Sequence, residues 1–164
     1  MARKKPARRS STAKRKAPEP RTPKVKPVPD GFRTVTAYLF VPGTVQLIEF
    51  LKAAFDATEI ARHDGPSGEV MYAQMQIGDS MIMLSEPREP WKPMPCGIFL
   101  YVKDTDLTYR WAIAAGATSL MEPSNQFYGD RNAGVRDPFG NNWWIGTHIE
   151  DVPTAELKRR MRAM

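Results

Sequence analysis

The 164-residue chain suits one domain of roughly 130 residues behind a tail, which is long enough to bury a hydrophobic core. Cys96 is the only cysteine, which excludes an intrachain disulfide and favours a reducing compartment, the cytoplasm. No run approaches the roughly 18 consecutive apolar residues needed to cross a membrane. The charged N-terminus lacks an apolar core, which predicts no secretory signal.

The net charge of +6 is divided unevenly along the chain. Residues 1–29 hold eleven Lys or Arg and one acidic residue, Glu19, so this part carries +10 and the remainder −4. Residues 1–30 contain six prolines and no aromatic residue, a composition that predicts disorder. This basic tail is either a weak, non-specific tether to nucleic acid or another polyanion, or a solvating segment without a partner. No aromatic side chain alternates with its charges to stack on bases.

The first ordered element is predicted at residues 34–41, where β-branched and aromatic side chains end at Pro42-Gly43. Thr44 is a candidate cap for a helix whose apolar residues follow a period of 3.6 up to Phe55. The rest of this half is predicted to form three short strands at residues 58–62, 69–77 and 80–85. The order is therefore βαβββ.

The same order repeats at an offset of about 61 residues, which indicates internal duplication. A strand at residues 98–102 precedes a helix that Asp104 or Thr105 can cap, and Gly116 suits its C-terminal end. The remaining strands are expected at 118–121, around Val135 and at 143–148, with a turn at 137–140. A last helix is predicted after Pro153, with Leu157 and Met161 facing the core.

Three segments carry a resemblance to a known family: VQLIEFLKAAFDAT (45–58), MQIGDSMIML (75–84) and YGDRNAGVRDPFGNNWWIGTHIED (128–151). The chain resembles the vicinal oxygen chelate (VOC) superfamily, in its PhnB-like glyoxalase/bleomycin-resistance/dioxygenase branch. The resemblance implies an α+β fold in which two βαβββ modules form a curled mixed sheet around a small-molecule site, often together with a partner subunit. The expected organisation is a tail at 1–30, a VOC domain at 31–152 and a C-terminal helix at 153–164.

The resemblance also locates the four positions where metal-dependent relatives carry their ligands: Thr36, Gln74, Gly97 and Trp144. Gln74 alone offers a usable donor, whereas a divalent site needs three or four. With two histidines and one cysteine in the chain, we expect no metal and no cofactor.

Strand alternation then predicts an aromatic, ligand-binding face. Its candidate residues are Thr36, Tyr38, Phe40, Tyr72, Gln74, Phe99, Tyr101, Trp144 and His148, with Arg131 as a possible clamp at the mouth. The alternative is that these aromatic side chains form only the packed face of a sheet.

Candidate catalytic groups are Gln74, His148 and Tyr38, although a hydrogen-bonded surface role for His148 is the simpler interpretation. Asp130 and Arg131 are expected to form an ion pair that holds a loop, and Cys96 to be inert. The leading hypothesis is a metal-free, homodimeric protein that binds a small organic molecule in an aromatic cup, as bleomycin-resistance proteins do. The alternatives are a glyoxalase-type lyase or isomerase, and an interaction protein docked on polyanions through its tail.

Overall fold

The computed structural model describes residues 25–163, so the disorder predicted for the start of the tail lies outside the described residues. Residues 25–37 form no helix or strand. Within the described part, no helix is long and apolar enough to cross a membrane.

The first module has the predicted βαβββ order. Its strands pair in the order β1-β4-β3-β2, with β1 parallel to β4 and the other pairs antiparallel. The elements are β1 (Tyr38–Phe40), α1 (Thr44–Phe55), β2 (Thr58–Asp64), β3 (Val70–Ile77) and β4 (Ser80–Ser85).

The second module repeats this arrangement, with the strand order β5-β8-β7-β6 and a parallel β5–β8 pair. Its elements are β5 (Gly97–Tyr101), α2 (Thr105–Ala114), β6 (Thr118–Asn125), β7 (Asp130–Arg136) and β8 (Asn142–His148). Helix α3 (Thr154–Met161) follows. The identical pairing of both sheets confirms the predicted α+β fold of two βαβββ modules.

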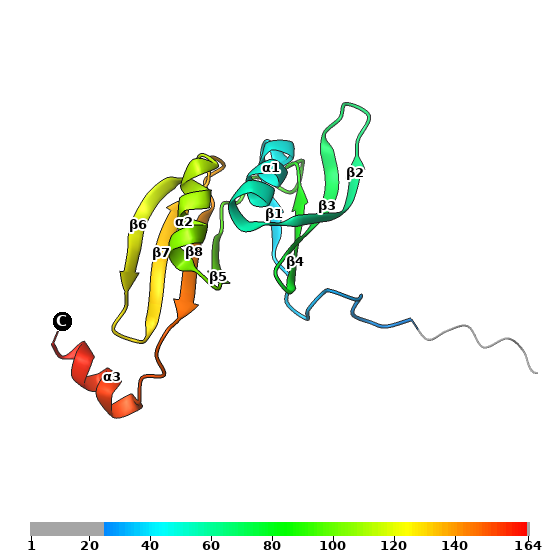
Figure 1. The fold of residues 1–164 in the computed structure, drawn as a ribbon. Helices are drawn as coiled ribbons and strands as arrows, with labels where there is room; N and C mark the ends of the chain where they lie inside the picture. Colours follow the sequence, from blue (N-terminus) through cyan, green and yellow to red (C-terminus); the bar gives the residue numbers. More distant parts are fainter. Residues whose placement is uncertain (1–24, 164) are drawn as a thin grey trace, which may run out of the picture.

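The helices α1 and α2 pack against each other and join the two modules into one hydrophobic core (Figure 1). The ring of Phe55 at the end of α1 lies 4.8 Å from that of Trp143 on β8. Because the helices occupy this side of the sheets, the opposite face of each sheet is left without a covering layer of its own.

The beginnings of the two helices are stabilised differently. Asp104 caps α2 as predicted, since its carboxylate accepts a hydrogen bond from Leu107 N (2.9 Å), and Gly116 adopts a positive φ of 103°. The prediction that Thr44 caps α1 is wrong. Glu86 performs this role from the end of β4, accepting bonds from Gly43 N (2.9 Å) and Thr44 N (2.7 Å).

Other details also differ from the predictions, including β6, which extends to Asn125 beyond the expected 118–121. Only Tyr38–Phe40 of the expected strand at 34–41 lies in the sheet, because Val35 is 87% exposed and Thr36 donates back to Arg33 O (3.1 Å). Met161 does not face the core and is 57% exposed. Instead, α3 is held by Arg160, which bonds Glu150 (2.7 Å) and Phe127 O (3.2 Å).

Candidate functional site

Each sheet has one face packed on its helix and one face turned away from it, which we call the open face. The first open face is identified by alternation: Leu39 and Ala73 are buried in the core, so the neighbouring side chains point the other way. It consists of Tyr38, Phe40, Tyr72, Gln74 and Met83. By the same alternation, the second open face consists of Phe99, Tyr101, Asp130, Asn132, Trp144 and His148.

The first open face carries a continuous aromatic cluster. The rings of Tyr38 and Phe40 lie 4.5 Å apart, and Tyr72 meets Tyr38 edge-on at 6.2 Å. Gln74 Nε2 donates to Tyr72 Oη (2.9 Å), so its amide is oriented within this cluster. Trp91, from the segment that joins the modules, extends the cluster by stacking 6.4 Å from Phe40. Offset and edge-on pairs of this kind are favourable and fix the rings relative to one another.

The second open face depends on two glycines beneath its aromatic rings. A Cβ atom at Gly134 would lie 2.6 Å from the Trp144 ring, and one at Gly146 would lie 2.8 Å from the Phe99 ring. Both distances are too short, so only glycine lets these rings lie flat on the sheet. The Phe99 ring in turn lies 4.9 Å from that of Tyr101.

A polar cluster closes one end of the second open face. His148 Nδ1 lies 2.7 Å from Asp130 Oδ1, and its Nε2 lies 3.0 Å from Asp151 Oδ1. Tyr101 Oη donates to the second oxygen of Asp130 (3.1 Å), and the Asp130 carboxylate is almost fully buried. The hydrogen bond to Asp130 chiefly, and that to Asp151 next, raises the pKa of His148 above its ordinary value.

Sequence reasoning missed Asp130 as the carboxylate that orients His148. Asp130 was expected to pair with Arg131, but β7 is a strand, so these neighbours point to opposite faces. The Asp130↔His148 register between β7 and β8 brings the two side chains together. No local pattern reveals this pairing, because it depends on how the last hairpin aligns.

Asn132 lies beside this cluster and has one unsatisfied atom. Its Nδ2 contacts Tyr128 Oη, whereas its buried Oδ1 has no hydrogen-bond partner among the described residues. A Cβ at Gly146 would lie 2.7 Å from this oxygen, which places the oxygen next to the Phe99 ring. Buried acceptors without a partner are rare and costly, so this atom marks a place where a ligand donor would be favoured.

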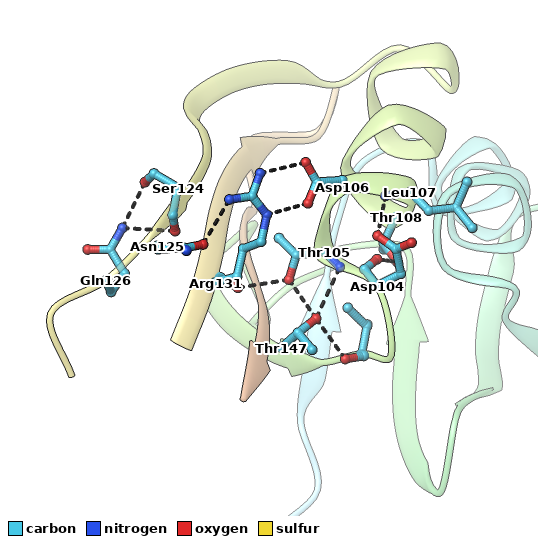
Figure 2. A network of polar contacts seen from close by, with 11 residues as sticks. Asp104, Thr105, Asp106, Leu107, Thr108, Ser124, Asn125, Gln126, Arg131 and Thr147 are labelled. Atoms are coloured by element: carbon cyan, nitrogen blue, oxygen red, sulfur yellow. Dashed lines mark hydrogen bonds and ion pairs between the residues drawn. The ribbon is translucent and has the colours of Figure 1, made fainter. Parts of the chain in front are cut away.

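Arg131 does not take part in the open face. Its guanidinium contacts both oxygens of Asp106 on α2 and donates to Asn125 Oδ1 (2.9 Å) (Figure 2). The Thr105 hydroxyl donates to the Arg131 carbonyl (2.8 Å) in the same network. Arg131 therefore fastens β7 to the helix, and we leave it out of the candidate site.

The four positions that correspond to the metal ligands of relatives do not fit a transition metal. Thr36 bonds to Arg33 O, Gln74 is held by Tyr72, Gly97 has no side chain, and Trp144 lacks an acceptor. The first two belong to one module and the last two to the other. Across residues 25–163, no group of three or more His, Cys, Asp or Glu is placed to hold a metal ion.

A cleft of about 910 Å³ lies between the modules. It is lined by β5 with Phe99 and Tyr101, by the turn at Gly78–Ser80, and by Leu107 and Trp111 of α2. None of the side chains that form the first open face lines it. The cleft thus borders the second open face along β5.

The family model of the Glyoxalase/Bleomycin resistance protein/Dioxygenase superfamily matches residues 33–145. Together with the paired βαβββ modules, this match shows that the chain belongs to that superfamily. Two uncharacterized proteins, from Mycobacterium bovis and Mycobacterium tuberculosis, are each 31% identical over 142 residues. The alignments cover 77% of this chain and 91% and 81% of those proteins, respectively.

Solved structures share the fold. TioX from Micromonospora sp. ML1 superposes with a TM-score of 0.59 at 20% identity, covering 70% of this chain and 99% of TioX. A superfamily member from Sphaerobacter thermophilus gives a TM-score of 0.57 at 19% identity, covering 68% and 94% of the two chains. At these identities the similarity establishes the fold alone.

Proposed function

We propose that the protein binds a small organic molecule between the first open face of one chain and the second open face of another, as a metal-free homodimer. The observation that carries this proposal is the exposure of aromatic side chains on both faces. Tyr38 is 37%, Phe99 44%, Trp144 38% and Tyr101 70% exposed. Contiguous exposed aromatic surface is characteristic of a binding or interaction site. Sequestration, as in bleomycin-resistance proteins, is the functional analogy.

The free β5 edge of the second sheet supports a second copy as the partner. At the two ends of the parallel β5–β8 pair, Asn142 N donates to Cys96 O (2.9 Å) and Val102 N donates to Gly146 O (2.8 Å). Alternate residues face the neighbouring strand, so the backbone groups of Phe99 and Tyr101 point away from β8. Among the described residues, no backbone hydrogen bond reaches them. Such an unpaired edge is a template for association with another chain.

The arrangement within one chain also supports this assembly. Because α1 and α2 pack between the modules, the two open faces do not close over one another in a single chain. A second copy placed along β5 would cover its free edge and part of the adjoining 910 Å³ cleft. The resulting site would take Tyr38, Tyr72 and Gln74 from one chain and Phe99 and Trp144 from the other. The single cysteine fits a cytoplasmic setting for this dimer.

A second candidate is a lyase or isomerase that uses acid–base groups in the same site. The Asp130–His148 pair favours it, since a carboxylate-oriented imidazole is a common proton-transfer group. In the proposed dimer, Gln74 and Tyr38 would approach this pair from the other chain. Turnover of a bound compound that is lost in His148→Gln would support this candidate over pure sequestration.

Polyanion binding by residues 1–29 is a separate proposal that rests on their charge of +10. We expect it to be weak and salt-dependent, because no aromatic side chain supplements the charges. A mobility-shift assay with duplex DNA at low and moderate salt tests it. Retention of the shift after the Lys and Arg residues are replaced by Gln would contradict it.

The binding proposal is tested by a thermal-shift screen of metabolites and antibiotics, carried out with and without EDTA. A ligand that binds only the folded state raises the unfolding temperature by mass action. We expect hits that persist in EDTA and that Trp144→Ser abolishes. Hits that vanish in EDTA would overturn the metal-free proposal. A response unchanged in both Trp144→Ser and Tyr38→Ser would place the ligand elsewhere.

Subunit mixing tests whether the site spans two chains. Tyr38→Ser damages only the first open face and Trp144→Ser only the second, so neither homodimer retains an intact site. A co-expressed heterodimer of the two variants contains one site with both faces undamaged. We therefore expect the hit to stabilise the heterodimer but neither parent. If the site lay within one chain, mixing would restore nothing.

A further inference from the structure

We propose that the polar end of the second open face is an oxyanion subsite, in which His148 Nε2 binds a carboxylate of the ligand while Asp130 fixes the imidazole. This inference rests on the proposed function and names the chemical class of its ligand: an aromatic or other flat organic carboxylate. His148 and Asp130 lie outside the four metal-ligand positions described above.

The imidazole of His148 is held in a fixed orientation. Asp130 Oδ1 lies 2.7 Å from Nδ1, and the carboxylate is buried and further held by Tyr101 Oη (3.1 Å). A buried carboxylate that already bonds two groups has little freedom, so the ring is aimed by the protein before a ligand arrives. The Asp130 carboxylate also favours the protonated imidazole, in which both ring nitrogens are donors.

The other ring nitrogen, Nε2, faces a carboxylate that can move. In the structure this nitrogen meets an oxygen of Asp151 at 3.0 Å, and the Asp151 side chain is fully exposed. The carboxylate of Asp151 thus occupies the position beside Nε2 that a ligand carboxylate would take. Being exposed, it can turn into solvent at little cost when a ligand carboxylate takes its place.

The surroundings specify the remainder of the ligand. Phe99 and Trp144 offer flat apolar surface on the same face, held against Gly146 and Gly134. Asn132 Oδ1 is buried, has no hydrogen-bond partner among residues 25–163, and could accept a hydrogen bond from an N–H or O–H group of the ligand. An organic carboxylate with a flat ring and a donor group uses all three features.

The chain is well suited to a direct test because it has only two histidines, His63 and His148. Imidazole NMR signals of the full-length, histidine-labelled protein are followed at pH 6 during titration with 4-hydroxybenzoate. His63 lies on β2 with its ring stacked 6.3 Å from Tyr72, so its signals report on the first open face. We expect a saturable shift of the His148 signals with 4-hydroxybenzoate, and a much smaller His148 shift with the neutral isostere 4-hydroxybenzamide. Equal responses to both compounds, or to benzylamine, would overturn the proposal.

Two substitutions with opposite expected effects separate ligand binding from a structural role. Asp130→Asn removes the orienting charge and should weaken 4-hydroxybenzoate binding about tenfold. Asp151→Asn weakens the competing group and should strengthen binding about two- to fivefold. If the cluster had only a structural role, both substitutions would change the affinity for 4-hydroxybenzoate in the same direction. Binding that is weakened by Asp151→Asn, or left unchanged by Asp130→Asn, would contradict the subsite.

Failure of this subsite is distinguishable from failure of the proposed function. If screen hits are lost in Trp144→Ser but are neutral or cationic, and His148→Gln leaves them unchanged, the aromatic site stands and the oxyanion subsite falls. If no compound responds to either open face, the proposed function itself is wrong.

Discussion

Replacement of Asp137 by asparagine should be among the most destabilising conservative changes in the chain. Asp137 is 3% exposed and opens the DPFGN turn between β7 and β8. One carboxylate oxygen accepts from Phe139 N and Asn141 N, both at 2.9 Å. The other accepts from Asn141 Nδ2 (2.8 Å) and Trp143 Nε1 (2.9 Å). All four donors point at one buried anion.

An amide cannot replace this carboxylate, because whichever oxygen becomes NH₂ then faces two donors. Two charge-assisted hydrogen bonds are lost, each worth about 1.5–3 kcal/mol, and their donors are left buried. We therefore expect Asp137→Asn to lower the free energy of unfolding by roughly 3–5 kcal/mol. Trp143, fully buried against Phe55, would lose the bond that fixes its indole.

Urea unfolding followed by circular dichroism, at one fixed protein concentration, measures this loss. Asp79→Asn is the matched control, since Asp79 occupies the corresponding turn of the first module with its side chain 86% exposed. The control should change stability by at most about 0.5 kcal/mol. An Asp137→Asn loss within about 1 kcal/mol of the control would refute the reasoning.

Three further predictions concern a helix cap, a glycine and a titration. Glu86→Ala should lower the free energy of unfolding by about 1–2 kcal/mol, because it removes the acceptor that caps α1. Urea unfolding measures this loss, and the exposed control Glu49→Ala should change stability little. Gly134→Ala should lower the free energy of unfolding by about 1–3 kcal/mol and displace the Trp144 ring. Gly97→Ala is the control and should be neutral, because a Cβ there meets nothing within 4 Å. Equal losses of stability in the two variants would contradict the close approach of Trp144 to Gly134. Asp130 and Asp151 raise the pKa of His148. The contribution of His148 to folding stability is therefore complete below its ordinary pKa of 6.5 and is lost as the pH rises through the raised pKa. The difference in melting temperature between the unmodified chain and His148→Gln should therefore shrink from pH 6 to pH 9, and a growing difference would contradict this sign.

Local patterns predicted the elements and their facing well. Apolar alternation within a strand decides which side chains share a face, so Tyr38 and Phe40, and likewise Trp144 and His148, could be assigned together from the sequence. The Asp104 cap and the Gly116 terminus were equally local, each set by a few neighbouring residues.

Contacts between distant residues could not be predicted in this way. Glu86 caps a helix that begins 42 residues earlier, and Asp130 meets His148 only because β7 and β8 align in one register. Arg131 was misplaced because its segment was interpreted as a loop, whereas adjacent residues of a strand point to opposite faces. The packing of α1 on α2, which leaves both open faces outward, likewise has no signature in the chain.

The central claim is that two copies of the chain complete the site through their open faces. Light scattering coupled to size-exclusion chromatography tests it most directly, because the chain mass is 18.5 kDa. We predict about twice this mass for the unmodified protein, and the single-chain mass after Phe99→Ser and Tyr101→Ser are combined at the β5 edge. A single-chain mass for the unmodified protein, or a dimer that the double substitution leaves intact, would contradict the account.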